Sequence, residues 1–326
     1  MERIKWVDVA KGLCILLVVA GHTGIPVYLV LWIFSFHMPF FFFISGFLYN
    51  NHKYTPIQFI FKRVKSLLLP YAIFSAIVIL LMPIYASHEV TIFELPSIAY
   101  DVFCHGWASD NYTYPLWFIP VLFVVEVVYM LLCRLPNIIK VICIILLGLL
   151  GIVLYWKNIS FVYTLPSVCT AIVFYYLGNL MHVKISSISI RRLKTVTMIT
   201  LFLLAFVISI LVSQYNLPQI DLAYNQLSNP ILMYIAAIAG IIIVILTSMI
   251  IISKSRVLTT LGTYFGKNTY VILATHVLYM QLLIRFLGNG NSFLRHLCMW
   301  ILMILTIYCI NNYVPWILGK KRVYEK

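Results

Sequence analysis

Residues 11–49 read KGLCILLVVAGHTGIPVYLVLWIFSFHMPFFFFISGFLY, and the two long apolar runs in this stretch carry His22 and His37. The hydrocarbon core of a bilayer is about 30 Å thick, so a helix needs about 20 apolar residues to cross it. The stretch therefore predicts a transmembrane hairpin with its turn at residues 23–31. An imidazole is costly in hydrocarbon and usually faces a bundle interior or a wet cavity, which makes His22 the first functional candidate.

The composition extends this prediction to the whole chain. Hydrophobic residues make up 63% of the sequence and charged residues 10%, with a mean hydropathy of +1.00, whereas soluble domains carry about 25% charged residues. The fold class is therefore an all-α, polytopic membrane bundle of about ten helices, forming one transmembrane domain over residues 1–326. The predicted spans lie near residues 10–30, 32–50, 67–86, 115–133, 138–156, 161–181, 195–213, 230–252, 269–287 and 294–314.

The positions of the basic residues predict the orientation. With the N-terminus in the cytoplasm, only Lys157 falls in a predicted outer loop, and Arg285 and Arg295 lie at outer helix ends. The remaining 20 of the 23 Lys and Arg residues fall on the inner side, as the positive-inside rule requires. Both termini are predicted to be cytoplasmic. The protein is predicted to lie in the inner (cytoplasmic) membrane. The rule also accounts for the net charge of +14, so nucleic-acid binding is not expected.

Two shorter segments on the inner side stand out. Thr55 and Pro56 are typical of the start of a helix, and the short segment that follows carries the cations Lys62, Arg63 and Lys65. This segment is expected at the inner interface before the third span, where its cations hold either a ligand or anionic lipid. Further along, the pattern Gly262-x-x-x-Gly266 either allows a close helix contact or belongs to a loop.

The longest predicted outer loop, residues 87–114, carries acidic and aromatic side chains and no Lys or Arg. Carboxylates beside aromatic rings suit a carbohydrate, although an interfacial aromatic belt beside a polar loop has the same composition. Asp101 and His105 stand four residues apart and would hold a metal only with further ligands. Because the cysteines also lack zinc spacing, no metal is expected.

Several titratable groups lie within or at the ends of the predicted spans. One interpretation is structural pairing in a polar bundle core, and the other is catalysis. Neutral histidine can take a proton from a hydroxyl group, and a carboxylate such as Glu126 can hold the ring in the required tautomer. His22 and His37 flank one turn and are expected to approach each other. The groups are Lys11, His22, His37, Glu126, His276 and Arg285.

Motifs along the chain resemble those of the membrane acyltransferase type 3 family. Its basic-x10-His motif matches Lys11 and His22. Residues 36–47 (FHMPFFFFISGF) and 63–71 (RVKSLLLPY) are also similar to family segments. Two further segments resemble the fucose 4-O-acetylase-like branch, namely Pro115-Leu116-Trp117-Phe118 and Gly266-Lys267-Asn268-Thr269 leading to His276.

The resemblance implies transfer of an acyl group, usually acetyl from acetyl-CoA, to a sugar hydroxyl of a cell-envelope polysaccharide or lipid-linked glycan. It implies that His22 is catalytic, as a general base or as a transient acyl carrier. The Arg-x-x-Arg motif of the family maps onto Arg63 and Ser66, so the second arginine is missing, and lysine does not reproduce its bidentate fork. The oligomeric state is unknown.

Other residues take roles in the same reaction. Lys11, Lys62, Arg63 and Lys65 are the expected contacts for the CoA phosphates, since charge-assisted bonds commonly hold phosphate. Glu126, Arg63 and His276 join His22 as candidate catalytic residues, and Arg63 or Arg285 would stabilise the oxyanion. The candidate acceptor-binding residues are His37, Asp101, His105, Trp117 and Arg285.

Two classes of alternative remain open. Ten spans with buried His, Glu and Arg also suit a proton-coupled secondary transporter, although no matching pair of interrupted spans stands out in the two halves. A membrane scaffold or glycan exporter would use the same polar residues only structurally. Uptake of solute without an acyl donor would favour the transporter, and loss of stability without loss of a specific reaction would favour the scaffold.

Overall fold

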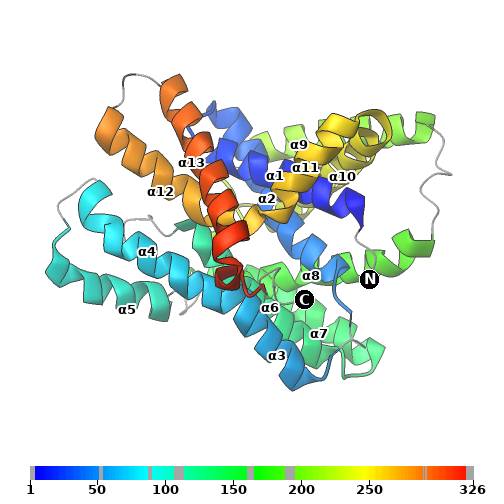
Figure 1. The fold of residues 1–326 in the computed structure, drawn as a ribbon. Helices are drawn as coiled ribbons and strands as arrows, with labels where there is room; N and C mark the ends of the chain where they lie inside the picture. Colours follow the sequence, from blue (N-terminus) through cyan, green and yellow to red (C-terminus); the bar gives the residue numbers. More distant parts are fainter. Residues whose placement is uncertain are drawn as a thin grey trace. The chain divides into compact units, whose positions relative to one another are not determined.

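The computed structural model describes residues 4–50, 54–86, 90–105, 114–159, 165–187, 195–288, 290 and 292–320. The all-α prediction is confirmed, because the described residues form helices and one isolated β-bridge, with no strand (Figure 1). The chain divides into two compact units, each described by itself. Unit 1 comprises residues 1–53, 125–160 and 165–269, and unit 2 comprises residues 54–124, 161–164 and 270–326.

The helices divide between the two units. Unit 1 contains α1 (Lys5–Gly21), α2 (Val27–Phe47), α7 (Asn137–Trp156), α8 (Leu165–Ser187), α9 (Thr195–Tyr215), α10 (Pro230–Lys254) and α11 (Arg256–Lys267). Unit 2 contains α3 (Pro56–Arg63), α4 (Leu69–Tyr85), α5 (Leu95–His105), α12 (Thr269–Leu287) and α13 (Ser292–Tyr313). The boundary between the units falls inside α6 (Phe118–Leu132).

Eight helices in the described residues are long and apolar enough to cross a membrane. The predicted count of ten is therefore not confirmed. The two predicted spans outside this set correspond to α1, which has 17 residues, and α8, which carries the polar residues Asn179 and His182. The eight candidates are Val27–Phe47, Pro56–Tyr85, Pro115–Leu132, Asn137–Trp156, Val196–Tyr215, Pro230–Lys254, Thr269–Leu287 and Ser292–Tyr313.

The turn between α1 and α2 is shorter than predicted. The expected turn reached residue 31, whereas α2 already begins at Val27. Pro26 has a φ of −53° and a ψ of 141°, and its fixed φ directs the chain straight into the next helix. The apolar residues that follow therefore belong to the helix, and His37 lies well inside α2.

In unit 1, glycines bring pairs of helices into backbone contact. A Cβ atom on Gly46 of α2 would overlap the carbonyl oxygen of Tyr175 in α8, and one on Gly178 would overlap that of Phe43. On the other side of the unit, a Cβ on Gly266 of α11 would overlap the carbonyl oxygen of Asp8 in α1. The close contact that Gly262-x-x-x-Gly266 allows is thus confirmed, with α1 as the partner.

The loop between α9 and α10 is anchored by a buried asparagine. Asn225 has a φ of 50° and is 4% exposed. Its amide nitrogen donates to the carbonyl oxygen of Gly151 at 2.9 Å, and its amide oxygen accepts from Thr170 Oγ1 at 2.7 Å. These bonds tie the loop to α7 and α8.

In unit 2, α3 continues into α4 without a break. Thr55 and Gln58 form a capping box before Pro56, as the predicted helix start requires. The short segment expected before the third span is the first part of a candidate span of 30 residues, because a π-helical turn, η1 (Val64–Leu68), joins α3 to α4. At 1.5 Å per residue this span is about 45 Å long and exceeds the hydrocarbon core, so its first turns extend beyond it.

Candidate active site

His22 directly follows the last turn of α1. It is the C-cap residue, its backbone N–H donates to the carbonyl oxygen of Val19 at 3.1 Å, and its side chain is half-buried. Its imidazole meets the ring of Phe34 edge to face, with 5.5 Å between the ring centroids. The C-terminus of a helix carries partial negative charge, and His22 lies at this end of α1.

His37 lies on α2 and is 3% exposed. Its Nδ1 is 2.8 Å from the carbonyl oxygen of Ile33, and because a carbonyl oxygen only accepts, Nδ1 donates this hydrogen bond. Phe34 also meets this imidazole, with 4.8 Å between centroids. The structure thus brings the two histidines against one phenylalanine ring.

Lys11 lies on the same face of α1 as His22. Eleven residues make about three helical turns, which separates the two side chains by about 16 Å along the axis. The face between them is closed by buried residues, of which Cys14 donates through Sγ to the carbonyl oxygen of His37 at 3.5 Å. Lys11 is half-buried and lies at the other end of this helix face from His22.

Glu126 lies on α6 and is 1% exposed. It is one turn before Tyr129, whose hydroxyl donates to the side-chain oxygen of Asn179 at 2.8 Å. Burial raises the pKa of Tyr49, which follows α2, and the negative charge of Glu126 acts in the same direction. These observations place Glu126 near Tyr49 and Tyr129, at the end of α2. This end lies about 18 Å from His37 along the helix axis. Its pairing with His22 stays a prediction.

The basic residues at the start of the third span belong to unit 2. Lys62 donates to the hydroxyl of Tyr54 at 2.8 Å and lies over that ring. Arg63 is half-buried, with its guanidinium carbon 5.2 Å from the ring centre of Phe59. Lys65 is exposed and lies within the π turn, a feature that often marks functional sites.

Three further candidates of unit 2 lie on α12 and on the short 3-10 helix η3 (Tyr114–Trp117). His276 is fully buried in α12, and its Nδ1 donates to the carbonyl oxygen of Ile272 at 2.9 Å. Arg285, in the last turn of α12, is exposed. Trp117 is 4% exposed, so its indole is buried.

Two candidates for the acceptor site fall on α5. Asp101 is half-buried there, and the helix is held to α4 by a hydrogen bond from the Tyr71 hydroxyl to the carbonyl oxygen of Val102 at 2.9 Å. His105 ends α5, and its side chain lies outside the described residues. The roles assigned to these residues stay predictions.

Two further side chains lie near these residues, and neither was among the candidates predicted from the sequence. Phe34 is one of many aromatic residues in an apolar run, and only its contacts distinguish it. Asp8 is 6% exposed on α1, three residues before Lys11. The sequence did offer one signal for Asp8. It is a carboxylate three residues before a basic residue, a spacing that puts both on one helix face.

Comparisons with known proteins complete the description of this site. A family model described as an acyltransferase domain, of the acyltransferase 3 family, matches residues 4–319, and these residues include both Lys11 and His22. No curated protein and no solved structure matches the chain. The fucose 4-O-acetylase-like branch stays a prediction. Because the match covers nearly the whole chain, this multi-pass membrane protein belongs to the acyltransferase 3 family.

Proposed function

We propose that the protein is an O-acyltransferase of the inner membrane that moves an acetyl group from acetyl-CoA to a hydroxyl of a cell-envelope or exported polysaccharide. The observation that carries the proposal is the family match over residues 4–319, which contain the basic-x10-His motif at Lys11 and His22. The position of His22 supports it further, because the side chain is half-buried at a helix end and rests on Phe34.

In the proposed reaction, His22 acts as a general base. It takes the proton of the sugar hydroxyl while the hydroxyl oxygen attacks the thioester carbonyl carbon. The tetrahedral intermediate collapses, the carbon–sulfur bond breaks, and the imidazolium returns the proton to the CoA thiolate. The partial negative charge at the end of α1 would stabilise the imidazolium.

Cationic side chains would assist at two points of the reaction. Arg63 or Arg285 would stabilise the oxyanion, a contribution of about 3 kcal/mol where water is excluded. Lys11, Lys62 and Lys65 would hold the phosphates of the donor, since ionised donors make the stronger hydrogen bonds to phosphate.

The test is the acetyl content of the envelope glycans, measured by NMR or mass spectrometry, in cells that express the wild type or His22→Ala. We expect His22→Ala to abolish glycan acetylation while the protein inserts at normal levels. His296→Ala is the matched control, because this histidine lies on α13 and hydrogen-bonds within its own helix. Acetylation that survives in His22→Ala at normal protein level would refute the proposal.

A further inference from the structure

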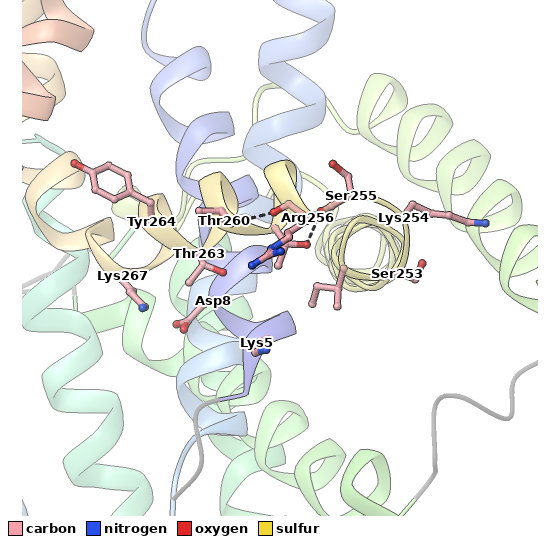
Figure 2. Close-up of a pocket in the computed structure, with 12 residues that line it drawn as sticks. Lys5, Asp8, Ser253, Lys254, Ser255, Arg256, Thr260, Thr263, Tyr264 and Lys267 are labelled. Atoms are coloured by element: carbon pink, nitrogen blue, oxygen red, sulfur yellow. Dashed lines mark hydrogen bonds between the residues drawn. The ribbon is translucent and has the colours of Figure 1, made fainter.

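A pocket of about 830 Å³ opens in unit 1, between the first turn of α1, the last turn of α10 and one face of α11 (Figure 2). Sites for small molecules measure roughly 300–1,000 Å³. The pocket therefore has room for a ligand the size of a nucleotide.

The sequence of α11 explains how this pocket is built. Ser255 begins the helix by accepting a hydrogen bond from the backbone N–H of Leu258 at 3.2 Å. Arg256, Thr263 and Lys267 follow at spacings that keep them on one helical face, and this face lines the pocket. Another face holds Gly262 and Gly266, which are buried against α1, so backbone contact fixes the distance between the walls.

The charge of the lining is mainly positive. Lys5, Arg256 and Lys267 line the pocket and are exposed, and the lining carboxylate, Asp8, is 6% exposed. Within the described part of the chain, none of these three cations donates to a protein acceptor. Figure 2 shows that the fourth cation of the lining, Lys254, is directed away from the others. Three cations that lack a protein acceptor in a cavity make a site for an anion.

The hydroxyl groups that line the pocket indicate which chemical groups the ligand carries. Thr260 Oγ1 donates to the carbonyl oxygen of Arg256 at 2.9 Å, and Thr259 Oγ1 donates to that of Ser255 at 2.8 Å, so both oxygens present lone pairs. Burial raises the pKa of Tyr264, whose hydroxyl therefore stays a donor. An anion must be held by the cations, while the threonine oxygens and Asp8 would accept from hydroxyl or amino groups of the same ligand.

We propose that this pocket binds a phosphate ester through Lys5, Arg256 and Lys267. Two sources share this chemistry, namely the phosphates of CoA and the head group of an anionic phospholipid. The use of CoA as a probe rests on the proposed function. The pocket begins about 20 Å along α1 from His22, so a ligand held there reaches the imidazole only through a long arm, such as that of a CoA thioester.

The first experiment measures binding of soluble phosphates. Full-length protein in phosphatidylcholine nanodiscs is titrated with inorganic pyrophosphate and with CoA by calorimetry. We expect Arg256→Gln/Lys267→Gln to weaken both affinities about tenfold or more, because charge-assisted bonds to phosphate are lost. Arg134→Gln/Lys157→Gln removes the same charge from exposed positions that do not line the pocket, and should bind as the wild type does. His22→Ala should also bind pyrophosphate normally, because this probe has no arm that reaches the imidazole.

The second arm tests the lipid source. Nanodiscs that contain phosphatidylglycerol are analysed by native mass spectrometry for retained lipid. Loss of retained phosphatidylglycerol in the pocket variant alone supports the site with a lipid phosphate as its occupant. The proposal is overturned if the pocket variant and the charge-matched control have the same affinities for pyrophosphate and CoA and retain the same amount of phosphatidylglycerol. If the double variant does not fold, Lys5→Gln replaces it under the same criteria.

Neither arm measures glycan acetylation. If phosphate binding is not found, the proposed role of His22 is unaffected. If His22→Ala keeps glycan acetylation, the proposed phosphate site is unaffected.

Discussion

Phe34 is the side chain that His22 and His37 both contact, and this makes it a test of the candidate site at the scale of one residue. We expect Phe34→Leu to lower the rate of glycan acetylation about threefold to tenfold, because a ring contact contributes about 0.5–1.5 kcal/mol to the position of an imidazole. The measurement is initial rate in membranes, normalised to protein amount. Phe202→Leu removes a ring that stacks on Phe206 and should leave the rate unchanged.

If Phe34→Leu and Phe202→Leu gave equal rates, the ring would have no part in positioning the histidines. Equal losses of rate together with equal losses of protein would instead indicate a packing role for both rings.

At this scale the sequence predicts which polar residues matter better than it predicts their surroundings. His22 and His37 stand out because imidazoles are rare in apolar runs, and their approach through one turn follows from the hairpin. The contact through Phe34 does not follow, because three further phenylalanines lie within seven residues of it on α2. Choosing among them requires the rotation of α2 against α1, which tertiary packing decides.

Among the elements, the crossing of α2 and α8 depends on two glycines. Gly46→Ala or Gly178→Ala should lower the free energy of unfolding by about 1–3 kcal/mol, because the new methyl group would overlap a backbone carbonyl that cannot move alone. Thermal unfolding of detergent-purified protein measures the effect. Gly290→Ala is the control, since a Cβ there meets no atom within 4 Å. A stability of Gly46→Ala equal to that of Gly290→Ala would argue against this helix contact.

A second element, the loop between α9 and α10, makes a separate prediction. Asn225→Ala removes two buried hydrogen bonds and the preference of asparagine for its left-handed backbone. Asn158 has a similar φ of 51° but is exposed, so Asn158→Ala measures the backbone effect alone. We expect Asn225→Ala to be less stable than Asn158→Ala by about 2 kcal/mol in the same unfolding assay. Equal stabilities would mean that the two hydrogen bonds add nothing net.

Element boundaries were predictable where local chemistry determines them. Thr55 and Pro56 begin α3 as expected, because capping and a proline at the first position act within one turn. The π turn after Arg63 was not predictable, since no short pattern specifies it. The pocket was not predicted either, because it forms only where the consecutive helices α10 and α11 meet α1, which lies far away in the sequence.

For the whole molecule, the distribution of basic residues predicts the membrane orientation. In a cysteine-free background, Thr23→Cys and Lys157→Cys should react with a membrane-impermeant maleimide in intact cells, whereas Arg134→Cys and Lys254→Cys should react only after the membrane is opened. The physical reason is that Lys and Arg next to spans remain on the cytoplasmic side. Reaction of Lys254→Cys in intact cells would contradict the predicted cytoplasmic placement of that loop.

The backbone contact between α1 and α11 has a consequence for how this protein can vary. Gly12, Gly262 and Gly266 set the spacing of the two helices through contacts outside the pocket, so the frame of the pocket does not depend on the residues that face into it. Exchanging lysine for arginine, or a cation for a neutral group, would change which anion is preferred and leave the scaffold intact. Ligand preference at this position can thus be redesigned one surface residue at a time.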